Sequence, residues 1–99
     1  MLESFTARTF RPLIGEAFTA TMGAETMELR LSEVSEPGSG RAGRGSGRTP
    51  FSLLFLGPAS PVRPQKIYRI EHSSLGIFDL FLVPVGPQDG SMAYEAVFN

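Results

Sequence analysis

Aromatic and branched side chains dominate residues 75–83, and apolar and polar residues alternate over residues 94–98. Both patterns are typical of β-strands. Between the two segments stands Asp89-Gly90, a dipeptide favoured in two-residue type I′ hairpin turns because both of its positions must adopt positive φ. The pattern predicts a C-terminal hairpin on which the other strands pack.

A two-residue turn at Asp89-Gly90 sets the register of this hairpin. Pro84 lacks an N–H donor, so its nitrogen must point away from a partner strand or lie at a bulge. A longer loop over residues 85–90 is the alternative, and it shifts the register. The two-residue turn places three pairs on one face, Val85 with Tyr94, Val83 with Ala96 and Phe81 with Phe98, and leaves Leu82 and Val97 on the other.

The N-terminal segment, residues 4–13, predicts a short helix. Phe5 and Phe10 are spaced among polar residues, and Pro12 ends any helix by the residue before it. We expect the two phenylalanine side chains to cover the sheet or to plug one end of a barrel. An irregular N-terminal arm is the alternative.

Two strands are predicted over residues 16–22 and 27–32, where apolar and polar residues alternate on either side of Gly23-Ala24. Val34 breaks the alternation, which requires a bulge near Ser32-Glu33 or the end of the strand. We therefore predict an antiparallel hairpin whose second strand carries the irregularity.

Two more strands complete the predicted fold. Residues 51–56 are apolar on both faces, which is typical of a strand buried on two sides, and residues 65–71 follow a proline-rich turn. The predicted fold class is mainly β: a six-stranded antiparallel small barrel or roll with one short N-terminal helix. Residues 35–49 are rich in glycine and arginine, so we expect a mobile loop within a single domain of residues 1–99.

Composition limits the classes of function. Nine basic and ten acidic residues give a net charge of -1, so bulk charge favours neither nucleic acid nor an anionic membrane as a partner. The absence of cysteine excludes disulfides and thiol chemistry. The sequence shows neither a signal peptide nor an apolar run of membrane-spanning length, so we expect a cytoplasmic protein without a membrane partner.

The C-terminal motif Tyr94-Glu-Ala-Val-Phe-Asn and the Phe-x-x-Leu-Ile-Gly-x-x-Phe pattern at residues 10–18 belong to a wider resemblance. Together with residues 51–58, 65–72 and 75–85, they resemble a family of small uncharacterised bacterial proteins that end in the same motif. The resemblance implies a compact, mostly β bacterial protein without assigned catalytic residues. It also suggests a gene neighbourhood shared with phage-tail-like fibre or collar proteins.

His72 is the only histidine, and without cysteine a metal site would need acidic residues for every other ligand. We therefore expect no metal and no cofactor, and a His72 side chain at the surface beside a turn. A triad of Ser73 or Ser74 with His72 and Asp79 lacks the Gly-x-Ser-x-Gly elbow that presents a nucleophile. The sequence therefore predicts no enzyme activity.

Arg41, Arg44 and Arg48 stand among glycines, as in short RGG-like segments that bind RNA. Only three charges are present, no aromatic residue is interleaved with them, and two glutamates are close in sequence. We expect a solvated loop, and ordering on an acidic partner is the alternative.

The sequence predicts a non-enzymatic protein-interaction or structural module. Apolar residues on both faces of the strands at 51–56 and 77–85 exceed what one core face needs. This favours self-association, or docking on another protein such as a component of a phage-tail-like assembly. The alternative is a small-ligand or nucleic-acid binder that uses the barrel mouth or the loop at residues 41–48. The expected outer-face contacts are Phe55, Leu82 and Val97.

Overall fold

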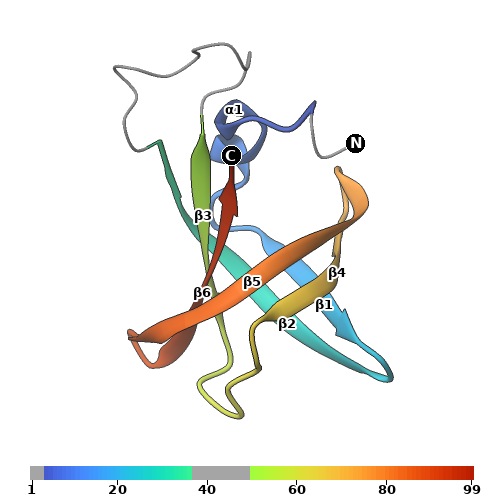
Figure 1. Ribbon diagram of the computed structural model, residues 1–99, viewed down its shortest axis with the longest axis vertical. Helices are drawn as coiled ribbons and strands as arrows, with labels where there is room; N and C mark the ends of the chain where they lie inside the picture. Colours follow the sequence, from blue (N-terminus) through green and yellow to red (C-terminus); the bar gives the residue numbers. More distant parts are fainter. Residues whose placement is uncertain (1–3, 37–49) are drawn as a thin grey trace.

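The structure is a computed structural model that describes residues 4–36 and 50–99. Its strands form one antiparallel barrel, with a short helix at one end (Figure 1). The predicted fold class, a six-stranded antiparallel small barrel or roll with a short N-terminal helix, is confirmed, and of the two alternatives the structure is the closed barrel. The elements are α1 (Ala7–Phe10), the 3-10 turn η2 (Arg11–Leu13), β1 (Ala17–Met22), β2 (Glu25–Ser35), β3 (Phe51–Gly57), β4 (Lys66–His72), β5 (Gly76–Gln88) and β6 (Ser91–Phe98).

The barrel closes because the first strand pairs with a strand from the second half of the chain. The spatial order is β1-β2-β3-β6-β5-β4, and β4 pairs with β1 to complete the ring. Four of the ladders join strands that are consecutive in sequence, and three of these, β1–β2, β4–β5 and β5–β6, have short connections that the structure describes. Closure removes free sheet edges wherever the ladders are complete.

The β1–β2 hairpin follows its sequence pattern. Gly23 has a φ of 63°, and Met22 pairs with Glu25 across the two-residue turn. The register of β2 on β3 shifts between Leu31 and Glu33, so the predicted bulge is present. The bulge restores the alternation that Val34 would otherwise break.

The second strand of this hairpin also extends further than predicted. Ser35 pairs with Ser52 of β3, so it belongs to a strand and not to the loop that the glycine and arginine content suggested. The next residue, Glu36, forms an ion pair with Arg11, with 2.9 Å between Arg11 Nη2 and Glu36 Oε1. The remainder of the predicted mobile loop lies outside the described residues.

The β5–β6 hairpin begins in the predicted register and then departs from it. Asp89 and Gly90 both have positive φ, and Gln88 pairs with Ser91 as the two-residue turn requires. A bulge between Pro84 and Gly86 then shifts the ladder, consistent with the missing N–H of proline. The predicted face of β5 is therefore wrong: Val83 pairs with Glu95 instead of Ala96, Leu82 points into the core, and Phe81 points outward.

Strand β3 has one buried face, not two. Phe51, Leu53 and Phe55 are buried, whereas Leu54 and Leu56 between them are only half-buried. The prediction of burial on both sides is wrong because a single-layer barrel has its core on the inner face alone.

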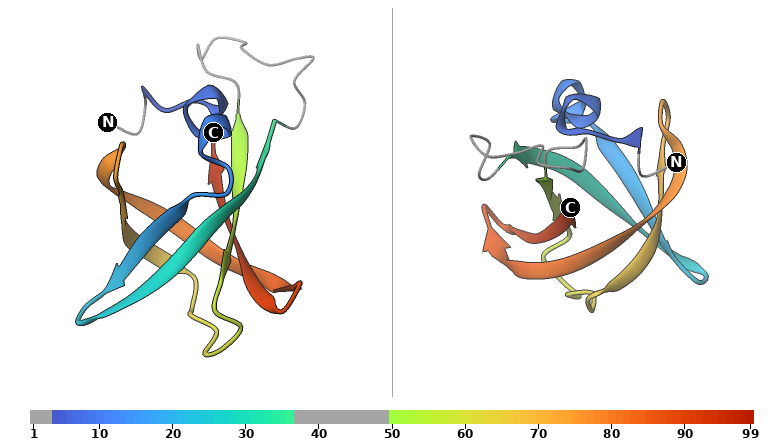
Figure 2. Two further views of the ribbon diagram at one scale, coloured as in Figure 1. Left: turned by 180° about the vertical axis from the view of Figure 1, so that it is seen from behind. Right: turned by 45° about the horizontal axis from the view of Figure 1, so that its top comes forward.

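Aromatic side chains from the N-terminal segment fill one end of the barrel. Helix α1 lies at the end where β3 begins and β6 finishes (Figure 2). The ring of Phe10 lies 5.3 Å from that of Phe5 and 5.8 Å from that of Phe98. Phe5 in turn makes an edge contact of 5.2 Å with Phe78 of β5. The expected phenylalanine plug is confirmed, and it bridges β5 and β6 from inside.

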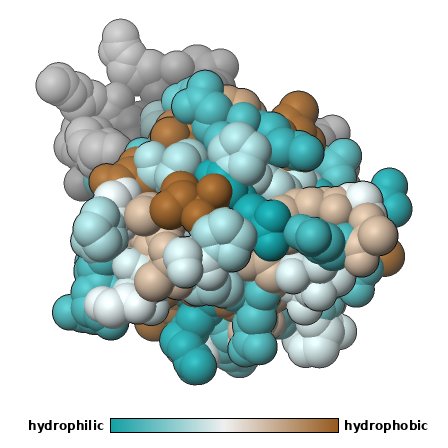
Figure 3. All heavy atoms as spheres, turned by 90° about the horizontal axis from the view of Figure 1, so that it is seen from below, coloured by the Kyte–Doolittle hydropathy of each residue, from teal (hydrophilic) through white to brown (hydrophobic). Residues whose placement is uncertain are grey.

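Two tyrosines fix the β3–β4 connection at the opposite end. The backbone N–H of Arg63 donates to Tyr94 Oη at 2.9 Å, and the Tyr68 hydroxyl donates to the carbonyl oxygen of Pro64. Arg63 also forms an ion pair of 3.0 Å with Glu25 at the start of β2. Seen from this end, the surface is mostly hydrophilic or neutral, with hydrophobic residues in separate places (Figure 3).

The raised pKa of Tyr68 predicts that the folded protein loses stability at alkaline pH. Its pKa lies above the ordinary value of 10.0, first because burial disfavours the phenolate and then because of Tyr94, with Arg63 acting in the opposite direction. The unfolded chain therefore loses the Tyr68 proton at lower pH than the folded chain. The protonated Tyr68 side chain therefore contributes to the stability of the folded state. That contribution is fully present below about pH 10, and it is lost as the pH rises through the folded-state pKa.

We expect the free energy of unfolding to fall less steeply above about pH 10 in the Tyr68→Phe variant than in the wild type. Urea unfolding at several pH values measures both slopes, with each protein referred to its own value near neutral pH. Identical slopes would show that Tyr68 does not titrate in the expected direction.

Candidate functional site

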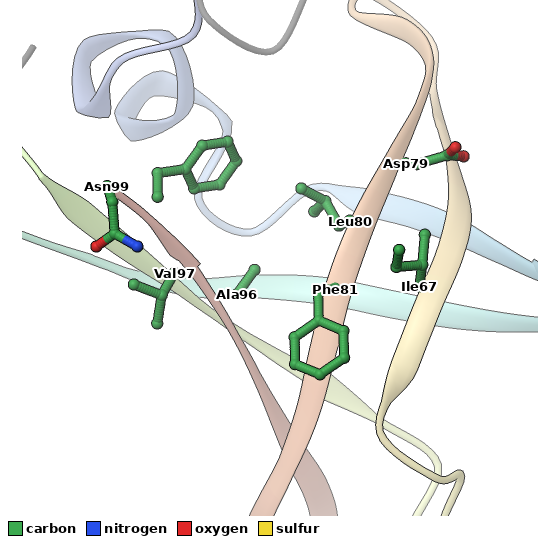
Figure 4. A pocket seen from close by; sticks show the side chains of 8 residues that line it. Ile67, Asp79, Leu80, Phe81, Ala96, Val97 and Asn99 are labelled. Carbon is green, nitrogen blue, oxygen red and sulfur yellow. The ribbon is translucent and has the colours of Figure 1, made fainter.

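The seam between β5 and β6 opens toward the α1 end of the barrel. Their ladder runs from Gln88 and Ser91 at the turn to Val83 and Glu95. Beyond that pair, β5 continues in register with β4 and β6 continues in register with β3. A groove of about 380 Å³ lies along this seam (Figure 4).

The floor of the groove is formed by side chains that also belong to the core. Leu80 of β5 and Ala96 and Phe98 of β6 are buried and line it from inside. The phenylalanine plug supports this floor, because the ring of Phe10 lies 5.8 Å from that of Phe98 and 6.5 Å from that of Phe78. The groove is therefore a shallow apolar depression over a packed interior.

The walls of the groove are apolar and exposed. Ile67 of β4 is 63% exposed, Phe81 of β5 is 51% exposed and Val97 of β6 is 60% exposed. Asp79 is the charged side chain among the groove residues, and Asn99 adds an amide. Figure 4 shows Ile67 beside Phe81 on one side, with Val97 across the seam.

These side chains belong to a larger surface, which we call the β4–β6 face. The cross-strand pairs on its outer side are Ile67 with Phe81, Arg69 with Asp79 and Glu71 with Ile77. The β4–β6 face consists of these six side chains and Val97.

Exposed hydrophobic residues are concentrated on the β4–β6 face. In the part of the chain that the structure describes, seven large hydrophobic side chains are about half exposed or more, and four of them lie on this face. Single exposed apolar residues are ordinary in soluble proteins, but a cluster marks an interaction surface. These four are Ile67, Ile77, Phe81 and Val97.

The predicted contact residues divide between core and surface. Phe55 and Leu82 are fully buried inside the barrel, so their prediction as outer-face contacts is wrong. The bulge at Pro84 explains Leu82, and Phe55 lies on the single inner face of β3. Val97 is exposed and lines the groove, as the prediction of an outer position requires. Arg41, Arg44 and Arg48 lie outside the described residues.

His72 is buried, which corrects the prediction of a surface histidine. Its ring stacks on Phe18 with 4.4 Å between ring centroids. The backbone N–H groups of Ser74 and Leu75 donate to Nδ1 at 3.1 and 3.2 Å. On the other side, Nε2 lies 2.8 Å from Oε1 of Glu16.

These contacts assign the tautomer of His72. Because Nδ1 accepts two backbone hydrogen bonds, the ring proton resides on Nε2, which donates to the Glu16 carboxylate. Both ring nitrogens are therefore engaged in holding the β4–β5 turn against the segment before β1. Asp79, the third member of the hypothetical triad, lines the groove instead. Among the described residues, no group of three or more His, Cys, Asp or Glu side chains is arranged to hold a metal ion.

Ile67, Ile77 and Phe81 were not predicted as surface contacts from the sequence. Ile67 and Ile77 carried a signal, since each lies two residues from a charged side chain on its own strand, Ile67 from Arg69 and Ile77 from Asp79, and so shares a face with it. An apolar residue in phase with charged neighbours indicates an outward position. Phe81 carried the same signal, because it lies two residues after Asp79, but the register counted back from the Asp89-Gly90 turn without the bulge at Pro84 placed it on the inner face.

Comparisons with known proteins give one family. The model of the family described as Domain of unknown function (DUF6916) matches residues 5–98. No curated protein and no solved structure matches the chain significantly. Among the described residues, no helix is both long enough and apolar enough to span a bilayer. Since the match covers every strand of the barrel and almost the whole chain, the chain belongs to the DUF6916 family, a domain of unknown function.

Proposed function

We propose that this protein is a non-enzymatic protein-interaction module that binds its partner through the β4–β6 face. The observation that supports this most strongly is the clustering of Ile67, Ile77, Phe81 and Val97 beside an apolar groove. Burying such side chains stabilises a complex by about 25 cal/mol for each Å² of apolar surface removed from water. The rigid strands around the groove hold these residues in place before binding, which limits the entropy cost of association.

The hydrogen bonds of both His72 ring nitrogens support a binding role for the protein over a catalytic one. A general base needs a free nitrogen that can reach a substrate proton. In this chain Nδ1 accepts from two backbone N–H groups and Nε2 faces Glu16. The histidine thus acts as a structural tie at the end of the β1–β4 ladder where β4 finishes and β1 begins.

The alternative of a small-ligand binder that uses the barrel mouth has less support. Phe5 and Phe10 occupy one end of the barrel, and hydrogen bonds from Tyr68 and Tyr94 hold the β3–β4 connection at the other. A nucleic-acid function would rest on the arginines at 41–48, and the mixed charge of the β4–β6 face does not favour a polyanion.

Site-specific photo-crosslinking in producing cells tests the proposal. We expect a crosslinker at position 81 or 97 to yield a discrete protein adduct, because both side chains face outward beside the groove. Val62 in the β3–β4 connection is the matched control, since it is 50% exposed but is not among the residues of the β4–β6 face or the groove. Equal adduct yields at positions 81 and 62 would contradict the proposal.

A further inference from the structure

We infer that the partner of the β4–β6 face is a second copy of this chain, related to the first by a two-fold axis parallel to β4 and β5. The inference rests on the proposed function and deepens it by naming the partner. It depends on the order of side chains across the β4–β5 ladder, which is self-complementary under this one symmetry operation.

The geometry follows from the register. Ile67, Arg69 and Glu71 point outward from β4, directly opposite Phe81, Asp79 and Ile77 on β5. A two-fold axis parallel to the strands places β4 of one copy over β5 of the other and keeps each cross-strand pair at the same height. Every residue of one strand then meets its own ladder partner from the second copy, as an isologous interface requires.

Two of the three resulting contacts match in character. Ile67 of each copy meets Phe81 of the other, which packs apolar side chains together twice. Arg69 of each copy meets Asp79 of the other, which forms two ion pairs of opposite charge. The third contact, Glu71 with Ile77, lies at the end of the ladder and stays partly hydrated.

The competing orientation fails on charge. A two-fold axis perpendicular to the strands, lying in the plane between the two faces, would place β4 over β4 of the second copy. Arg69 would then face Arg69, and Asp79 would face Asp79. Like charges brought together at an interface oppose association, so the parallel axis is favoured.

The predicted interface is small. It consists of six side chains on two strands of a convex barrel, with Val97 at its margin. Interfaces of less than about 1,200 Å² in total area are weak and reversible. We therefore expect a dimer with a Kd on the order of 10–100 µM.

Charge reversal tests the pairing. We expect Arg69→Asp alone and Asp79→Arg alone to weaken self-association at least about tenfold, because each variant creates two like-charge contacts per dimer. Sedimentation velocity over a concentration series measures the association constant. Glu28→Arg, a reversal at an exposed position on β2, is the matched control and should leave the association constant unchanged.

Mixing the two variants separates the contact between copies from the contact within one chain. Arg69 and Asp79 are also ladder partners in the same copy, so each reversal alters the monomer as well. A one-to-one mixture of Arg69→Asp and Asp79→Arg leaves that intrachain defect in place. Between the copies, however, two aspartates now face two arginines, so we expect the mixture to dimerise at wild-type strength.

The outcomes divide clearly. A mixed dimer with monomeric parents establishes the inferred pairing. Wild-type dimers together with a monomeric mixture would overturn this two-fold arrangement. A wild-type chain that stays monomeric at several hundred micromolar, on the order of ten times the expected Kd, would overturn self-association. In that case, crosslinking of a different protein to position 81 would still support the proposed function. Equal crosslinking yields at positions 81 and 62 would contradict both the proposed function and the inferred dimer.

Discussion

Replacing Phe10 by alanine is expected to lower the free energy of unfolding by about 3–5 kcal/mol, the range found when a fully buried phenylalanine is truncated. Phe10 is completely buried at the α1 end of the barrel. Its ring lies close to those of Phe51 and Phe98, and the 4.4 Å stack of these two joins β3 to β6. Truncation therefore leaves a cavity between strands that cannot collapse without breaking the ladder.

Urea unfolding followed by circular dichroism measures this effect. Ile14→Ala is the matched control, because Ile14 follows η2 and is exposed, and we expect it to change the free energy of unfolding by less than about 1 kcal/mol. If Phe10→Ala changed stability no more than Ile14→Ala, the N-terminal segment would not be part of the core. Such a result would also remove the support beneath the groove.

Replacing His72 by alanine is expected to lower the free energy of unfolding by about 2–4 kcal/mol. The change removes the stack on Phe18 and leaves the N–H groups of Ser74 and Leu75 without their acceptor. It also cuts the link to Glu16, whose backbone already holds Leu31 through a hydrogen bond of 3.1 Å. The β4–β5 turn would then lose its attachment to the start of β1.

Two isosteric variants separate the roles of the ring nitrogens. Asparagine places an acceptor near the position of Nδ1, whereas glutamine reaches the position of Nε2 and lacks that acceptor. Because Nδ1 serves two backbone donors and Nε2 serves one exposed carboxylate, we expect His72→Asn to retain more stability than His72→Gln. The reverse order would show that the contact with Glu16 dominates.

The hairpins could be predicted because their signals are local. Gly23-Ala24 and Asp89-Gly90 are turn dipeptides between alternating segments, and the irregularity at Ser32-Glu33 is visible as a broken period. The two phenylalanines of the N-terminal segment were expected to plug a barrel end, and they do. Each of these predictions depends on residues only a few positions apart.

The inner and outer faces of β5 were predicted wrongly. Asp79 marked the outer face, but the register was counted back from the Asp89-Gly90 turn without the bulge that Pro84 indicated. One shifted residue exchanges the two faces of a strand. That single step placed Leu82 in the core and Phe81 on the surface, and it hid the exposed aromatic side chain of β5.

The burial of His72 depends on a partner remote in sequence. Glu16 is 56 residues away, and the two meet because β1 pairs with β4 to close the barrel. No local pattern encodes that contact. The groove has a similar origin, since it arises where the β5–β6 ladder stops while β5 and β6 each continue along a different neighbour.

The most direct test of the central claim compares photo-crosslinking from position 81 with crosslinking from position 62 in the same cells. Phe81 and Val62 are equally exposed, so any difference reports on binding and not on access to solvent. The proposed interaction module predicts a strong, discrete adduct from position 81 and only background from position 62. Background yields from both positions would contradict the claim that the β4–β6 face is where this protein meets its partner.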